Sequence, residues 1–253
     1  MVDKQKFLIY RNSGDGDVHY DRFEVPISKG MSVLEALFYI QDYFDSTLSF
    51  RYACRGAICG SCGLTINKVP LLACRTQVLT LKTAKKPNNL PEFNFGDLPN
   101  WDQETEILVE PVPNMKILKD LIVDMDPFWK FYREVEPFFK REWKDKTPES
   151  KQSPSQMRKI EHLVYCILCG LCWACPVSKR NPNFLGPAQL AKAKRFISDS
   201  RLSEDKKESI ILRIQKKDAI LACEKYFVCN RVCPKDVMPG TAIKDLRDEW
   251  IKE

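Results

Sequence analysis

Histidine is scarce in this sequence. His19 and His162 are the only two histidines among 253 residues, and neither lies within a group of cysteines. Zinc sites commonly combine cysteine with histidine ligands. The scarcity of histidine therefore excludes the commonest mixed Cys/His zinc sites.

Long apolar runs are also missing. A membrane-spanning helix needs roughly 18 to 20 consecutive apolar residues, whereas runs such as residues 219–223 are short and end at charged residues. The N-terminal residues show neither the apolar core of a signal peptide nor an Arg/Ser-rich presequence. We therefore expect no export signal and no transmembrane segment, and any membrane attachment would come through a partner.

Charge of one sign is not concentrated anywhere along the chain. The formal net charge is +6, and acidic residues interrupt the basic ones throughout. Such mixing is typical of a solvated surface. No nucleic-acid-binding motif is present, so we expect no nucleic-acid partner.

Cysteine, by contrast, is abundant. The chain has 11 cysteines. An odd number excludes complete disulfide pairing within the chain, and an intracellular setting disfavours disulfides in any case. Zinc or iron–sulfur ligation is the better interpretation. The cysteines form a first group (Cys54, Cys59, Cys62 and Cys74), a second group (Cys166, Cys169, Cys172 and Cys175) and a third group (Cys223, Cys229 and Cys233).

No cysteine lies between the first and second groups, which predicts two metal-bearing domains of an α+β protein. Residues 1–112 are expected to form a β-grasp domain like that of plant-type ferredoxins. Runs 6–11, 23–27 and 105–110 have the composition of strands. Ser32 and Glu35 form a capping-box pattern at the start of a helix, and residues 14–17 suit a loop.

Residues 113–253 are expected to form an all-helical domain of the bacterial two-cluster ferredoxin type. Apolar residues in 115–124 recur at the i, i+3, i+4 spacing of a helix. Segments 186–197, 203–222 and 240–252 are further predicted helices, the first with Pro187 at an early helical position. Residues 128–143 are rich in aromatic residues, which we assign to core packing. Residues 144–159 are polar and predict a loop.

The first cysteine group has the C-x4-C-x2-C spacing of a plant-type [2Fe–2S] site, with Cys74 as the later fourth ligand. Gly56, Gly60 and Gly63 are expected to let the backbone curve tightly and to leave amides free to point at sulfur. A four-cysteine zinc site is the alternative, but zinc sites favour paired C-x2–4-C knuckles.

The second and third groups predict two further clusters that exchange one ligand, as in two-cluster ferredoxins. Tyr226 occupies the position where a cysteine would complete the third group. That absence leaves three thiolates for one cluster, which suits [3Fe–4S]. The predicted [4Fe–4S] ligands are Cys166, Cys169, Cys172 and Cys233, and the predicted [3Fe–4S] ligands are Cys175, Cys223 and Cys229.

Segments outside the cysteine groups also resemble one family. Residues 110–114 followed by 119–125 look like a domain junction of that family, and residues 181–187 and 198–201 look like its segments after the second group. With three cysteine groups in the family's order, the chain resembles the iron–sulfur subunits of succinate dehydrogenases and fumarate reductases over nearly its full length.

The resemblance implies a role in electron transfer. A separate FAD-containing flavoprotein subunit would oxidise succinate or reduce fumarate. This chain would pass single electrons through [2Fe–2S], [4Fe–4S] and [3Fe–4S] clusters to quinone at a membrane anchor, in either direction. It would lie peripherally on the cytoplasmic side of the membrane, held by partner subunits. No catalytic side chain is expected in this chain, because the clusters carry the redox chemistry.

Two departures from the family pattern bear on the third cluster. Only two residues separate Cys172 from Cys175, where the family usually has three. If the segment is helical, this shift rotates Cys175 by about 100°, so the local turn differs or cluster sharing changes. Arg180 and Glu224 occupy positions where quinone-using members commonly carry Trp and His.

These departures keep a second hypothesis open, in which the equivalent subunit of a related flavoenzyme uses a thiol/disulfide or other non-quinone carrier. A purely structural zinc protein and a standalone ferredoxin are further alternatives.

Overall fold

The structure is a computed structural model that describes residues 3–14, 16–81, 90–139 and 149–250. By its internal contacts the chain divides into two compact units. The first unit comprises residues 1–125 and 167–174, and the second comprises residues 126–166 and 175–253. The predicted domain limits of 1–112 and 113–253 stay a prediction.

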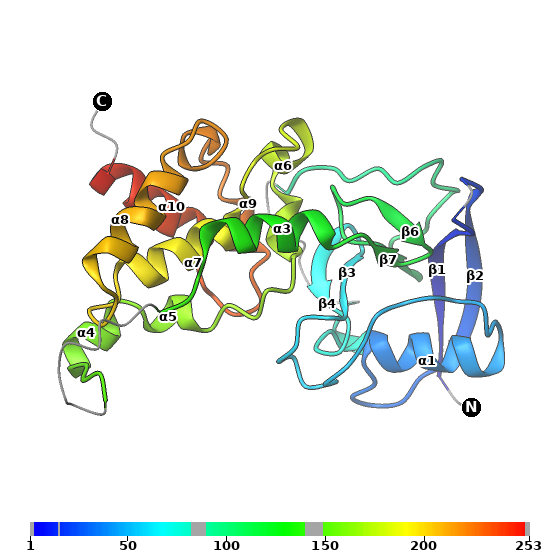
Figure 1. Cartoon of the computed structure of the whole chain (residues 1–253). Helices are drawn as coiled ribbons and strands as arrows, with labels where there is room; N and C mark the ends of the chain where they lie inside the picture. Colours follow the sequence, from blue (N-terminus) through cyan, green and yellow to red (C-terminus); the bar gives the residue numbers. More distant parts are fainter. Residues whose placement is uncertain (1–2, 15, 82–89, 140–148, 251–253) are drawn as a thin grey trace. The chain divides into compact units, whose positions relative to one another are not determined.

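A five-stranded mixed sheet forms the body of the first unit, with the order β2-β1-β5-β3-β4 (Figure 1). Strands β1 and β5 are parallel, and the other neighbouring pairs are antiparallel. Its strands are β1 (Lys4–Asn12), β2 (Val18–Pro26), β3 (Gly63–Ile66), β4 (Val69–Leu72) and β5 (Glu106–Glu110). The three runs predicted as strands therefore all fall on strands of one sheet.

Helix α1 (Val33–Tyr43) begins at the predicted capping box. The Ser32 hydroxyl accepts a hydrogen bond from the Glu35 amide, and the Glu35 carboxylate accepts one from the Ser32 amide. Five apolar residues of α1 are buried in the core of this unit: Val33, Leu34, Ala36, Leu37 and Ile40. This helix and the mixed sheet form the predicted β-grasp arrangement. A short helix, α2 (Val78–Leu81), follows the last cysteine of the first group.

The helix predicted over residues 115–124 is wrong. The segment forms a hairpin of β6 (Ile117–Lys119) and β7 (Ile122–Val123). Asp120 adopts a left-handed conformation in the turn, with φ of 43°. Its buried carboxylate accepts hydrogen bonds from Arg11 and from the backbone amides of Asn12 and Ser49. These contacts with distant parts of the sequence override the local helical spacing.

The second unit is helical, and α7 (Pro187–Ile197) is its central helix. Helix α7 contacts α3, α5, α8 and α10, as Figure 1 shows. Pro187 occupies the early helical position expected from the sequence. The other α-helices are α3 (Asp126–Val135), α4 (Pro154–Arg158), α5 (Glu161–Val164), α6 (Pro176–Arg180), α8 (Glu204–Ile214), α9 (Val228–Arg231) and α10 (Pro239–Trp250).

Two predictions for this unit need correction. The segment 203–222 is α8 followed by a separate short 3-10 helix, η2 (Ile220–Ala222), rather than one helix. The segment 144–159 contains α4, which Ser153 caps through its hydroxyl, so it is not wholly a loop. The aromatic residues Phe128 and Phe131 of α3 are buried, as expected for core packing, but Phe138 and Phe139 are exposed, so the assignment is wrong for those two. Residues 140–148 lie outside the described residues.

Candidate metal centres

The first cysteine group lies on a loop whose backbone amides point at sulfur. The amides of Gly56, Ile58 and Cys59 each lie 3.3 Å from Cys54 Sγ, and the Cys54 amide lies 3.4 Å from Cys59 Sγ. These donors, led by the Gly56 amide, lower the pKa of the Cys54 thiol to about 6. A loop that stabilises a thiolate in this way suits an anionic cluster ligand.

The curvature of this loop comes from different residues than the sequence suggested. Arg55 and Ala57 adopt left-handed conformations, with φ of 55° and 56°, and Gly60 has φ of 76°. Gly56 and Gly63 do not have positive φ. The expected role of glycine in tight curvature is therefore confirmed only for Gly60.

Cys62 and Cys74 come together at the base of the loop. The Cys74 amide lies 3.5 Å from Cys62 Sγ, and Cys62 is buried. Burial is the main cause that raises the pKa of the Cys62 thiol to about 12, and the thiols of Cys74 and Cys59 act in the same direction. All four cysteines of the first group are therefore linked by short contacts or by mutual electrostatic influence. The set fits a small cluster whose iron offsets the negative charge of neighbouring thiolates.

Part of the second cysteine group packs behind this loop within the first unit. A Cβ placed on Gly60 would lie 2.7 Å from Cys169 Cβ, and one on Gly63 would lie 3.2 Å from the Cys169 carbonyl oxygen. Leu168 and Gly170 flank Cys169 with φ of 55° and 77°. Gly60 and Gly63 of this loop thus lie so close to Cys169 that only a residue without a side chain fits at either position.

Cys166 and Cys233 share surroundings within the second unit. Both pack against a core cluster formed by Leu163, Ala191, Val237 and Ala242. The Val237 amide lies 3.4 Å from Cys233 Sγ. Cys169 and Cys172 belong to the other unit, so the complete predicted [4Fe–4S] set stays a prediction.

The predicted [3Fe–4S] ligands all lie in the second unit and influence one another. Cys175 and Cys229 are buried, at 6% and 4% exposure. Burial, followed by the nearby thiols of Cys175 and Cys223, raises the pKa of the Cys229 thiol to about 12. Burial also raises the pKa of Cys175 and of Cys223. Three adjacent thiols, two of them buried, cannot all ionise without positive charge between them, and the iron of a cluster would supply it.

The short spacing before Cys175 is accommodated by a break in the helix. Residues 171–174 form the 3-10 helix η1 (Leu171–Ala174), and Cys175 has φ of −59° and ψ of 132° as the N-cap of α6. The segment is therefore not continuous α-helix. The rotation of about 100° expected for a helical segment therefore does not apply.

Arg180 and Glu224 form an ion pair near the third cysteine group. Arg180 Nη2 lies 2.6 Å from Glu224 Oε1, and the Tyr226 hydroxyl lies 3.0 Å from Glu224 Oε2. The Arg180 guanidinium also lies over the Tyr226 ring, 5.5 Å from its centroid. All three side chains are exposed, and positive charge on Arg180 acts to lower the pKa of Cys175.

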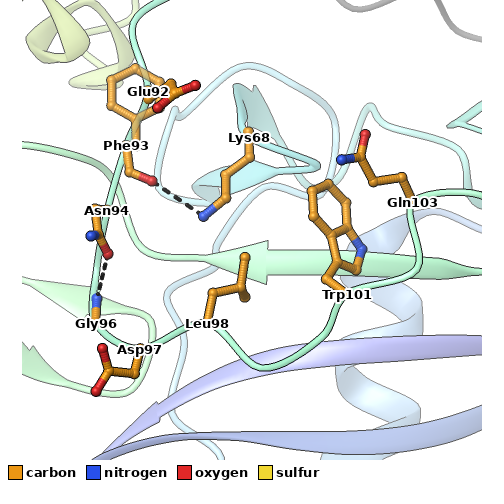
Figure 2. A pocket seen from close by; sticks show the side chains of 9 residues that line it. All are labelled: Lys68, Glu92, Phe93, Asn94, Gly96, Asp97, Leu98, Trp101 and Gln103. Atoms are coloured by element: carbon orange, nitrogen blue, oxygen red, sulfur yellow. Dashed lines mark hydrogen bonds between the residues drawn. The ribbon is translucent and has the colours of Figure 1, made fainter.

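A pocket of about 530 Å³ in the first unit lies apart from these groups, since no cysteine lines it. Figure 2 shows Lys68 reaching across it to the carbonyl oxygen of Phe93, at 3.2 Å. Lys68 also pairs with buried Glu110 at 2.6 Å, and Glu110 accepts a hydrogen bond from Tyr20. The pocket is lined by Lys68, Glu92, Phe93, Asn94, Gly96, Asp97, Leu98, Trp101 and Gln103.

Two features are absent from the residues that the structure describes. No three His, Cys, Asp or Glu side chains there converge as the ligands of a single metal ion would. No helix in the same ranges is long and apolar enough to cross a membrane.

Each of the two parts of the chain matches a known protein family. Residues 6–130 match the 2Fe-2S iron-sulfur cluster binding domain, and residues 162–237 match the 4Fe-4S dicluster domain. The fold and the cysteine loops therefore define an iron–sulfur protein in which a [2Fe–2S] ferredoxin domain precedes a helical dicluster domain.

Individual relatives extend this match over almost the whole chain. The fumarate reductase iron-sulfur subunits of Haemophilus influenzae and Escherichia coli are 32% and 34% identical, covering 97% and 99% of this chain and 92% and 93% of the relatives. That of Mycobacterium tuberculosis is 35% identical over 93% of this chain and 87% of the relative. The chain belongs to the family of fumarate reductase and succinate dehydrogenase iron–sulfur subunits.

A solved structure supports the fold independently. A chain of the Mycobacterium smegmatis Sdh1 complex superposes with a TM-score of 0.81, at 20% identity. The match covers 98% of this chain and 96% of that one. The α+β fold class predicted from the sequence is confirmed.

Proposed function

We propose that this chain relays single electrons between the FAD of a flavoprotein subunit and a membrane anchor in a succinate dehydrogenase or fumarate reductase complex. The observation that carries the proposal is 34% identity over 99% of the chain to a fumarate reductase iron–sulfur subunit. The chain acts as an electron-transfer subunit, so the succinate or fumarate chemistry belongs to the flavoprotein partner. Binding to partner subunits holds it peripherally at the cytoplasmic face of the membrane.

The cysteines divide among three clusters in this proposal. Cys54, Cys59, Cys62 and Cys74 hold [2Fe–2S], Cys166, Cys169, Cys172 and Cys233 hold [4Fe–4S], and Cys175, Cys223 and Cys229 hold [3Fe–4S]. Contacts within the first group support the first set, and the electrostatic influence of Cys175 and Cys223 on Cys229 supports the third.

The clusters supply the one-electron redox chemistry, and the residues of this chain bind and shield them. Backbone amides aimed at Cys54 stabilise negative charge there, which favours the reduced form of the cluster bound through it. Buried Cys175 and Cys229 are kept from bulk water. The close approach of Gly60 to Cys169 supports a short path from the first cysteine group to a ligand of the next cluster.

A second candidate function differs only in the electron acceptor. The exposed Arg180–Glu224 pair and Tyr226 form a polar surface near Cys175. Their hydrogen bonds to one another favour a polar or protein-borne carrier, such as a thiol/disulfide carrier, over an apolar quinone ring at this position. The test is quinone reduction by the complex that carries an Arg180→Ala, Glu224→Ala double substitution. An unchanged rate of quinone reduction would contradict this candidate.

Electron paramagnetic resonance of the purified complex, with two matched cysteine variants, tests the main proposal. Cys229→Ser is expected to abolish the signal of the oxidised [3Fe–4S] cluster and to spare that of the reduced [2Fe–2S] cluster. Cys62→Ser is expected to abolish the signal of the reduced [2Fe–2S] cluster and to spare that of the oxidised [3Fe–4S] cluster. Loss of both signals from either variant would contradict the division of ligands between the two sites.

A further inference from the structure

The loop that carries Cys54 combines a strained backbone with exposure to water. Arg55 adopts a left-handed conformation with φ of 55°, which is unfavourable for arginine. Cys54, Arg55 and Gly56 are exposed, and Ile58 is 69% exposed. Burial therefore contributes little to the conformation of this part of the loop, and another interaction has to offset the strain at Arg55.

The Arg55 side chain lies on an aromatic cluster formed by Phe38, Phe50 and Tyr52. Its guanidinium carbon Cζ lies over the Phe38 ring, 4.6 Å from the centroid, and 5.6 Å from the centroid of the Tyr52 ring. A guanidinium within about 6 Å of a ring centroid is attracted by the negative face of the ring. This contact connects the exposed loop to helix α1, which carries Phe38.

The aromatic cluster is fixed by packing within the first unit. The Phe38 ring lies edge-to-face with Tyr52, at 4.5 Å between centroids, and with Phe50, at 5.3 Å. Phe50 is buried, and Leu34, one turn before Phe38 on α1, is buried as well. Arg55 therefore lies on rings whose positions are set outside the cysteine loop, so its side chain can hold the loop in place.

The conformation at Arg55 determines where three loop amides lie. The amides of Gly56, Ile58 and Cys59 each lie 3.3 Å from Cys54 Sγ. All three follow Arg55 in the chain and Cys54 precedes it, so the backbone dihedrals of Arg55 set the distances from these amides to the sulfur. Hydrogen bonds to a ligand sulfur stabilise the reduced cluster more than the oxidised one, because reduction adds one negative charge.

We propose that Arg55 is a positioning residue for the [2Fe–2S] cluster. Its stacking on Phe38 holds the loop amides at Cys54 Sγ and thereby raises the reduction potential of the cluster. The added electron resides on the cluster, and Arg55 transfers neither an electron nor a proton. The inference rests on the proposed assignment of the first cysteine group to [2Fe–2S].

The test is a redox titration of the reduced [2Fe–2S] signal by electron paramagnetic resonance, in the purified complex. Phe38→Leu removes the ring and keeps the charge of Arg55, and it is expected to make reduction about tenfold less favourable, or 59 mV for a one-electron couple. Arg55→Ala should shift the potential at least as far. The double variant should shift it no further than Arg55→Ala, because both substitutions remove one shared contact.

Two further variants separate stacking from charge. Arg51→Ala, at an exposed arginine three residues before Cys54, is the matched control and should leave the potential unchanged. Arg55→Gly lacks both the charge and the stacking, but glycine adopts positive φ without strain. It should therefore shift the potential less than Arg55→Ala does. If Arg55→Ala does not assemble the cluster, iron analysis should show that Arg55→Gly does.

Four results would overturn the inference. They are an unchanged [2Fe–2S] potential in Phe38→Leu, equal shifts in Arg55→Gly and Arg55→Ala, an equal shift in Arg51→Ala, or failure of both Arg55 variants to assemble the cluster. Absence of a reduced [2Fe–2S] signal from the wild-type complex would instead contradict the proposed function, so the two failures are distinguishable.

Discussion

Gly60 and Cys169 approach each other so closely that no side chain fits between them. A Cβ on Gly60 would lie 2.7 Å from Cys169 Cβ and 2.8 Å from its Cα. Gly60 lies between two cysteines of the first group, while Cys169 belongs to the second group. The backbone thus brings the loop of one predicted cluster against a predicted ligand of the next.

Substituting Gly60 tests whether this approach matters for electron transfer. Gly60→Ala must move the loop from Cys169, because the new methyl group clashes with the backbone and φ of 76° is strained for alanine. We expect slower electron transfer from the [2Fe–2S] cluster to the next one and a stability loss of about 1–2 kcal/mol. Rapid-freeze paramagnetic resonance after reduction measures the transfer rate. Gly30→Ala is the control, because Gly30 also has positive φ but its Cβ would meet no atom within 4 Å. An equal loss of transfer rate in both variants would contradict the explanation.

Gly240 has the corresponding role beside the third cysteine group. A Cβ on Gly240 would lie 3.1 Å from Cys229 Sγ and 2.8 Å from Cδ1 of Phe227. We expect Gly240→Ala to broaden or shift the oxidised [3Fe–4S] signal while leaving the [2Fe–2S] signal unchanged, because the methyl group presses on one ligand only. Spectra of the oxidised and reduced complex provide the measurement. An unaltered [3Fe–4S] signal would show that Cys229 is not held by this contact.

The buried pair of Arg11 and Asp120 predicts a large effect on stability. Arg11 Nε lies 3.1 Å from Asp120 Oδ1, and the Asp120 side chain is only 2% exposed. Asp120→Ala would leave Arg11 short of a partner and remove the acceptor for two backbone amides. We expect a loss of about 3–5 kcal/mol, measured by denaturant unfolding. Asp21→Ala, which removes a more exposed partner of Arg11, should cost less than about 1 kcal/mol.

Glu110 predicts a dependence of stability on pH. Burial is the main cause that raises the pKa of this carboxyl, although Lys68 and Tyr20 act in the opposite direction. The folded chain therefore binds a proton at Glu110 more tightly than the unfolded chain does. That contribution to stability is present below about pH 4.5, the ordinary pKa of a glutamate, and is lost as pH rises through the raised pKa.

Glu110→Gln removes this titration. We expect the unfolding temperature of the variant to fall less than that of wild type as pH is raised from 5 to 8. Differential scanning calorimetry of the two proteins measures the difference. Glu24→Gln, which alters an exposed pair with Lys4, should behave like wild type. If the unfolding temperature fell more steeply with pH in Glu110→Gln than in wild type, the pKa of Glu110 would not be raised by folding, which would contradict the explanation.

The predictable part of the molecule is the part set by local patterns. The capping box of Ser32 and Glu35 and the C-x4-C-x2-C spacing are each encoded within a few residues, so the start of α1 and the cysteine loop could be expected. The hairpin at residues 117–123 could not, because Asp120 is held in its turn by Arg11, 109 residues earlier in the chain. Local spacing alone favoured a helix there.

The same limit applies to the candidate sites. The left-handed conformations of Arg55 and Ala57 have no signal in the residue types, since both disfavour positive φ.

The most direct test of the central claim is quantitative paramagnetic resonance of the anaerobically purified wild-type complex, with iron and sulfide analysis of the same sample. Thiolates grouped four, four and three predict an oxidised-state [3Fe–4S] signal and reduced-state [2Fe–2S] and [4Fe–4S] signals, each at one spin per chain. A fully metal-loaded preparation that contained zinc without iron and sulfide, and gave none of these signals, would contradict it.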